Sequence, residues 1–132
     1  MTTVPFRLTL SDLSGSPHHP RCTLLVMPPE MDIANCEELY GAVCDAVDSR
    51  RDLTDVLVLD FTGTSFTDSR GARLISATRE YAAGAGIALR LAVAEEGVVR
   101  RVVTLTGVRR DVPVYGSAAD AVAGEEELWD WD

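Results

Sequence analysis

The chain contains no lysine, and all twelve of its basic residues are arginine. This absence excludes lysine Schiff-base chemistry, the lysine of a phosphate-binding P-loop and the lysine that response-regulator receivers use. No apolar run approaches the roughly 18 residues that a membrane-spanning helix needs, and the N-terminus lacks the basic-then-apolar pattern of a secretory signal. These absences predict a cytoplasmic protein without a membrane partner.

Cysteine and aromatic residues are also scarce. The three cysteines, Cys22, Cys36 and Cys44, are an odd number without CxxC spacing, so we expect free thiols packed among apolar residues. Aromatic residues make up 6% of the chain, which leaves the core to Val, Leu, Ala and Ile. His18-His19 lack further ligands and do not predict a metal site. No nucleophile constellation or Gly-rich phosphate loop is present, so neither a cofactor nor catalysis is expected.

Length and charge define one acidic domain. A chain of 132 residues supports a single modest core. Its formal charge of −9 argues against nucleic acid as a partner. Part of that charge lies at the end, which predicts a core over about 4–124 and an acidic tail over 125–132. Trp129 and Trp131 in this tail are interpreted either as docking residues or as part of a frayed terminus.

Hydrophobic periodicity predicts strands that alternate with helices. Strands are expected at Pro5–Leu10, Cys22–Met27, Val56–Asp60, Ile87–Ala94 and Val112–Tyr115. Helices are expected from Asp32 or Asn35 to Ser49, Ser69 to Ala83, Glu95 to Thr106 and Ser117 to Leu128. The first helix is expected to direct Ile33, Cys36, Leu39, Tyr40, Val43 and Val47 to one side. The order β-β-α-β-α-β-α-β-α predicts an α/β fold with a mostly parallel sheet covered by helices.

The segment from Val56 to Gly71 is the most informative part of the chain. An unbroken apolar run is typical of a strand covered on both faces, and a short polar loop follows it. Thr67-Asp68-Ser69 then offers three side-chain oxygens to the first free N–H groups of the next helix. Because a helix N-terminus tolerates added negative charge, Ser69 is predicted to be a switch.

Four blocks of the sequence, in order, resemble one family. They are Pro29-Glu30-Met31-Asp32; the stretch LDFTGTSFTDSRG from Leu59 to Gly71; AGIALRL from Ala85 to Leu91; and VRRVVTLTGV from Val99 to Val108. Together they span much of the chain and resemble a STAS domain of the anti-sigma-factor antagonist type. The resemblance implies a STAS fold over one domain, 1–132.

The resemblance also implies a mechanism. Family members are bacterial proteins that bind a GHKL-type Ser/Thr kinase, which is itself an anti-sigma factor, and so release a sigma factor for transcription. The kinase then phosphorylates the serine of the Asp-Ser-x-Gly motif, and a phosphatase restores binding. By position, Ser69 is the acceptor, Asp68 its preceding acid and Asp32 the acid of the first loop. The implied partner-binding residues are Glu30, Asp32, Asn35, Thr67, Asp68, Ser69, Arg70, Gly71 and Arg73. The free protein is expected to be a monomer.

Two features depart from the family pattern. Arg70 stands where relatives commonly carry a small residue, and Arg73 lies one helical turn beyond Ser69. We interpret these arginines as groups that partly neutralise a phosphate on Ser69, or that select a kinase with an acidic rim. Pro28-Pro29 replaces the glycine that the family favours and is expected to stiffen the first loop.

Other functions stay open at this point. Ser69 and Asp68 also fit plain helix caps, and Gly71 also fits close helix packing. A STAS subunit of a stressosome-like or lipid-transport assembly would use the same surface without reversible phosphorylation. A receiver-like phosphoprotein that uses Asp60 is disfavoured, because the acidic pair and the lysine of receivers are missing.

Overall fold

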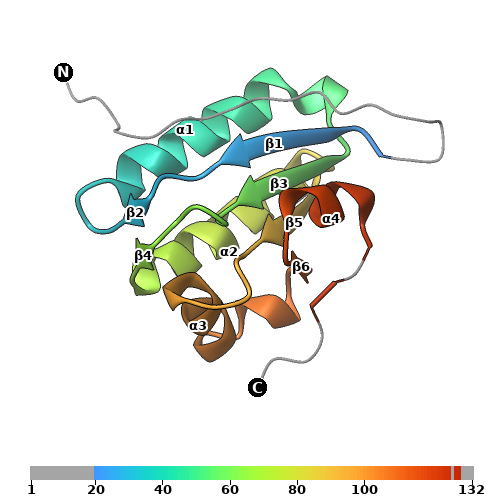
Figure 1. The fold of residues 1–132 in the computed structure, drawn as a ribbon. Helices are drawn as coiled ribbons and strands as arrows, with labels where there is room; N and C mark the ends of the chain where they lie inside the picture. The colour runs from blue at the N-terminus through green and yellow to red at the C-terminus, as the bar shows by residue number, and fades with distance from the viewer. Residues whose placement is uncertain (1–19, 126, 129–132) are drawn as a thin grey trace.

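A four-stranded, all-parallel sheet forms the centre of the molecule in the computed structural model, which describes residues 20–125 and 127–128 (Figure 1). The strand order is β1 (Cys22–Val26), β3 (Val56–Asp60), β5 (Ala88–Ala92) and β6 (Val114–Tyr115). β3 pairs with both neighbours along its whole length, and its first four residues are buried. The predicted α/β class with a mostly parallel sheet is confirmed.

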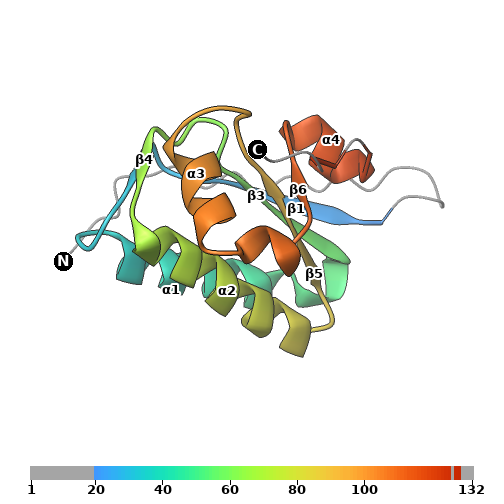
Figure 2. The ribbon, with the colours of Figure 1, turned by 90° about the horizontal axis from the view of Figure 1, so that it is seen from below.

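Helices cover both faces of this sheet (Figure 2). α1 (Cys36–Ser49), α2 (Ser69–Gly84) and α3 (Val98–Leu105) pack on one face, whereas α4 (Ala118–Ala123) lies on the other. Successive strand residues point to opposite faces, so Leu57 and Leu59 join the cluster under α1 to α3 while Val56 and Val58 join that under α4. Two short 3-10 turns, η1 (Arg51–Leu53) and η2 (Val108–Arg110), complete the chain order.

A second, two-stranded sheet lies beyond the carboxyl ends of β1 and β3. It pairs β2 (Glu30–Met31) with β4 (Phe66–Thr67) in parallel, with Glu30 opposite Phe66 and Met31 opposite Thr67. These two strands were not predicted from the sequence. They place the segment that follows β1 directly beside the segment that leads into α2 (Figure 1).

Two helix boundaries differ from the prediction, and one predicted core residue is exposed. α1 begins at Cys36, directly after Asn35, as one of the two predicted starts has it, so Ile33 lies in the preceding turn and is 71% exposed instead of buried. α3 begins at Val98 because Gly97 precedes it with φ of 119°, outside the helical region. α4 ends at Ala123, since Gly124 adopts a left-handed φ of 71°.

The chain after α4 returns to the sheet. Glu127 forms an antiparallel bridge with Tyr115, and the Leu128 N–H donates to the Val114 carbonyl at 2.8 Å. The helix predicted as far as Leu128 is therefore replaced by an extended segment along β6. The predicted strand at 5–10, His18-His19, Trp129 and Trp131 lie outside the described residues.

All three cysteines are free thiols, as predicted. None of the described helices is long and apolar enough to cross a bilayer.

Candidate functional site

Two loops meet at the carboxyl end of the parallel sheet. We call residues 27–35 the first loop and residues 61–68 the second loop. Proline carbonyls of the first loop accept their connecting hydrogen bonds: the Thr64 hydroxyl donates to Pro28 at 2.7 Å, and the Ser65 N–H donates to Pro29 at 2.7 Å. Proline lacks an N–H but keeps its carbonyl, so the Pro28-Pro29 pair stiffens the first loop and still binds the second.

Asp68 begins α2 and pairs with Arg70. One carboxylate oxygen of Asp68 accepts the Arg70 N–H at 2.8 Å, and the other accepts the Arg70 guanidinium at 3.0 Å. The Thr67 hydroxyl donates to the Asp68 carbonyl instead of accepting from the helix. Ser69 is the exposed first residue of α2. Of the three predicted capping side chains, Asp68 is therefore the one that caps.

Thr67 and Gly71 form the buried support of this helix start. Both residues are buried, and a Cβ on Gly71 would lie 2.0 Å from the Thr67 hydroxyl oxygen. Glycine at this position lets β4 approach the first turn of α2 closely. This agrees with the interpretation of Gly71 as a packing residue, and it places Thr67 and Gly71 behind the surface.

Asp32 and Asn35 hold the first loop in a closed turn. The Asp32 carboxylate accepts the Ala34 N–H at 2.8 Å, and the Asn35 side-chain oxygen accepts the Asp32 N–H at 3.0 Å. The Asn35 amide also donates to the Glu30 carbonyl at 2.7 Å. Although Asn35 directly precedes α1, its side chain caps this turn and not the helix.

The charged groups of the two loops converge around one buried thiol. Burial raises the pKa of the Cys36 thiol, the carboxylates of Asp68 and Asp32 raise it further, and Arg70 opposes them. Met31 pairs with Thr67 in the β2–β4 sheet, and Asp32 and Asp68 directly follow these two residues. The pairing thus brings the two loops and the predicted acids Asp32 and Asp68 together.

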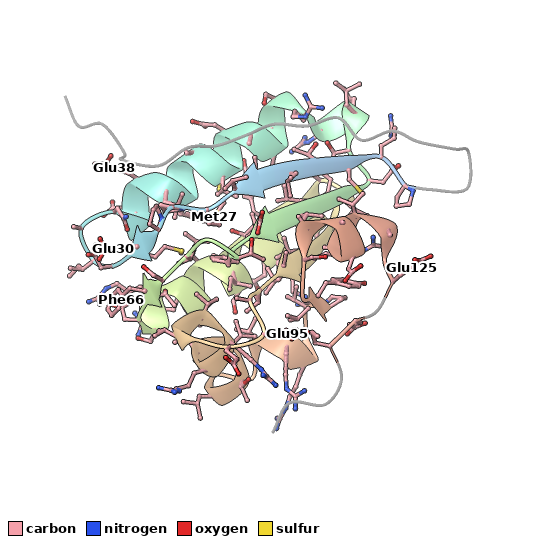
Figure 3. All side chains as sticks on the ribbon, in the orientation of Figure 1. Met27, Glu30, Glu38, Phe66, Glu95 and Glu125 are labelled. Carbon is pink, nitrogen blue, oxygen red and sulfur yellow. The ribbon has the colours of Figure 1, made fainter. Side chains whose placement is uncertain are left out.

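Exposed apolar side chains border these acids. Ile33 is 71% exposed and Phe66 is 43% exposed, and Phe66 lies beside Glu30 in the β2–β4 pairing (Figure 3). We call the surface formed by Glu30, Asp32, Ile33, Phe66, Asp68 and Ser69 the two-loop face. Neither apolar residue was predicted at the site, and Ile33 was expected in the core. The turn residues before Cys36 were the available signal for Ile33.

A shallow groove adjoins this face on the side of α3. It lies between α2 and the α3–η2 segment, and its lining includes Ser69, Arg73, Ser76 and Thr106. Arg73 thus lies one turn beyond Ser69, in the groove and not among the acids. Within the described residues, no cluster of three His, Cys, Asp or Glu side chains is arranged to hold a metal ion.

The fold and this site define a small α/β domain with an exposed serine at the start of its second helix. The STAS domain family matches residues 16–121. The chain belongs to the STAS domain family. No curated protein sequence matches the chain.

Three solved structures illustrate the similarity of fold. An anti-sigma factor antagonist from Mycobacterium paratuberculosis is 21% identical, with 93% of this chain and 97% of that chain covered and a TM-score of 0.70. The anti-sigma factor antagonist SpoIIAA in its unphosphorylated form is 17% identical, with coverage of 91% and 99% and a TM-score of 0.64. The murine anion transporter Slc26a9 is 21% identical over 78% of this chain but only 17% of the transporter, with a TM-score of 0.59.

Proposed function

We propose that this STAS domain is an anti-sigma factor antagonist whose binding is switched off by phosphorylation of Ser69. In this proposal it binds a GHKL-type Ser/Thr kinase that is also an anti-sigma factor, and a sigma factor is released as a result. A phosphatase then removes the phosphate and restores binding. The observation that carries the proposal is the exposed Ser69 at the start of α2, next to the Met31–Thr67 pairing that brings the two loops together.

The position of Ser69 suits a switch that leaves the fold intact. Phosphorylation adds about −1.5 to −2 charges, and the helix dipole stabilises negative charge at an N-terminus by about 0.3–1 kcal/mol at exposed sites. The phosphate therefore changes the surface and not the core. Close to Asp68 it adds like charge to a partner interface, and each 1.4 kcal/mol lost there lowers affinity about tenfold.

The two-loop face supplies the contacts that a protein partner needs. Ile33 and Phe66 offer apolar area, while Glu30, Asp32 and Asp68 offer carboxylates. Asn35, Thr67 and Gly71 support this face from within the loops. The proposed role is that of a cytoplasmic binding protein in bacterial transcription control, and not that of an enzyme.

A pull-down from lysate of the source organism tests the proposal. Wild-type protein, Ser69→Ala and the control Ser76→Ala, another exposed serine of α2, are incubated with ADP or ATP and read by mass spectrometry. We expect wild type and Ser76→Ala to retain a small kinase with ADP and to release it with ATP, with phosphate mapped to Ser69. Ser69→Ala should retain the kinase with both nucleotides. Absence of phosphate on Ser69 together with nucleotide-independent capture of other proteins would contradict the switch.

The similarity to the STAS part of a transporter supports a second candidate function. In this alternative the domain is a scaffold or accessory subunit of a stressosome-like or lipid-transport assembly, and it binds through the same face without reversible phosphorylation. The same pull-down separates the two, because a scaffold would retain its assembly equally with ADP, with ATP and after Ser69→Ala.

A further inference from the structure

Ser69 lies at one end of the groove between α2 and α3–η2, and Arg73 lines the same groove. Residues four apart on a helix lie on one face, so the Arg73 side chain follows Ser69 along α2. Ser76 lines the groove one further turn along. The serine therefore has a cationic neighbour on the side that faces away from the first loop.

The two arginines near Ser69 differ in their ion pairing. The Arg70 guanidinium already binds the Asp68 carboxylate at 3.0 Å, and the side chains of this pair are 42% and 33% exposed. Arg73 is exposed and forms no ion pair with any residue of the described segments 20–125 and 127–128. Arg70 is thus engaged in holding the helix start, whereas the guanidinium of Arg73 is available.

We propose that Arg73 is the counter-ion of the phosphate on Ser69. The proposal rests on the proposed function, since it requires that Ser69 is the acceptor. A guanidinium presents a planar fork of donors that matches phosphate oxygens. Bound in this way, the phosphate lies along the groove towards α3, and Arg70 stays with Asp68.

In this arrangement Arg73 affects both the charge of the phosphate on Ser69 and its removal by a phosphatase. Arg73 neutralises part of the new charge and holds the phosphate against α2, so a phosphatase must withdraw it from the guanidinium. The charged groups nearest the phosphate are Arg70 and Arg73 on α2, the helix cap Asp68 and Asp32 in the first loop, whereas Glu80 lines the far end of the groove. The carboxylates raise the second pKa of the phosphate, and the guanidinium groups lower it.

Phosphorus NMR measures the pairing directly. Phosphoserine is installed at position 69 during translation by amber suppression, and the second pKa of the phosphate is titrated in wild type, Arg73→Gln, Arg70→Gln and Arg79→Gln. Arg79 is the matched control, because it is exposed on the same helix but lies ten residues from Ser69, about 15 Å along the axis. This separation exceeds the Debye length of about 8–10 Å.

We expect Arg73→Gln to raise the phosphate pKa by about 0.5 unit, the shift of a partly exposed ion pair. Arg70→Gln should raise it less, and Arg79→Gln should leave it nearly unchanged. The proposal is overturned if Arg73→Gln shifts the pKa no more than Arg79→Gln does. It is equally overturned if Arg70→Gln gives the largest shift, since Arg70 would then hold the phosphate.

The failure of this inference is distinguishable from failure of the proposed function, because the installed phosphoserine needs no kinase. If the phosphate pKa is unshifted in Arg73→Gln but the kinase is still released after phosphorylation of Ser69, only the proposed role of Arg73 is contradicted. If the phosphate pKa is shifted but no kinase is captured, only the proposed switch is contradicted.

Discussion

Gly71 and Thr67 are in contact across the first turn of α2, where a Cβ on Gly71 would fall 2.0 Å from the Thr67 hydroxyl oxygen. Thr67 is 4% exposed and its hydroxyl donates to the Asp68 carbonyl, so it has little room to move. Gly71→Ala should therefore lower the free energy of unfolding by about 1–3 kcal/mol, the usual cost of overpacking. Urea unfolding measures this loss.

Removal of the opposing hydroxyl tests the stated cause. The double variant Gly71→Ala, Thr67→Ala relieves the 2.0 Å contact and should recover part of the lost stability relative to Gly71→Ala. If the two losses simply add, the steric explanation is wrong.

Asp68 combines a helix cap with an ion pair, and two substitutions separate these roles. Asp68→Ala removes both and should cost about 0.5–2 kcal/mol of stability, mostly through the lost cap. Asp68→Asn keeps an oxygen for the Arg70 N–H and loses the charge, so it should cost only a few tenths of a kcal/mol, as for a partly exposed pair. Thermal unfolding at neutral pH compares them. Equal losses in the two variants would show that the ion pair dominates.

Exposed apolar residues on the two-loop face should contribute to partner binding. Phe66→Ala and Ile33→Ala remove side chains that are 43% and 71% exposed, so each should change stability by less than about 1 kcal/mol. Each should weaken binding of the proposed kinase partner in the presence of ADP by roughly 5- to 30-fold, or about 1–2 kcal/mol. Calorimetric titration gives the affinities.

Leu105→Ala is the matched control for this comparison. Leu105 is 78% exposed at the end of α3, outside the two-loop face. Its substitution should leave the affinity unchanged. If it weakens binding as much as Phe66→Ala does, the interface has been assigned to the wrong surface.

Stability should fall in mild alkali because two thiols are buried. Burial raises the pKa of the Cys22 and Cys36 thiols in the folded protein, whereas an unfolded thiol titrates near about 8.5. As the pH rises, the unfolded state loses these protons first and becomes favoured. The contribution is therefore fully present below the unfolded pKa and is lost as the pH rises through the folded pKa.

Urea unfolding at several pH values between about 7 and 10 measures this dependence. The variant Cys22→Ala, Cys36→Ala should have a lower stability at neutral pH but a flatter profile above the unfolded thiol pKa. If the free energy of unfolding falls with pH equally steeply in this variant and in wild type, the loss of stability in alkali is due to other groups. Tyr115 is one such group, because burial also raises its pKa.

The elements that the sequence predicted well are those with a long, regular pattern. β3 is an unbroken apolar run between two covered faces, and α2 combines a cap at Asp68 with sustained periodicity. β2 and β4 have two residues each, which is too short for any alternation to be visible. The early end of α4 depends on the left-handed conformation of Gly124, which a glycine permits but does not require.

The sequence indicated candidate residues for the site but not their pairings, and their role in binding stays a prediction. Asp32 and Asp68 directly follow the paired residues Met31 and Thr67 of two strands that were not predicted. That Arg70 binds Asp68 while Arg73 lies in a groove depends on side-chain orientation, and the sequence gives both arginines the same apparent role. The outward position of Ile33 likewise depends on a turn of three residues before α1.

Exposed side chains on the two-loop face can be substituted without weakening the backbone bonds that join the two loops. Glu30 and Phe66 are held opposite each other by backbone pairing, and the Pro29 carbonyl fixes the second loop without any contribution from either side chain. Mutations at these two positions can therefore accumulate without loss of the scaffold. Through very few substitutions, duplicated copies of such a domain within one genome can come to recognise different partners. Each copy then no longer binds the partner of the other.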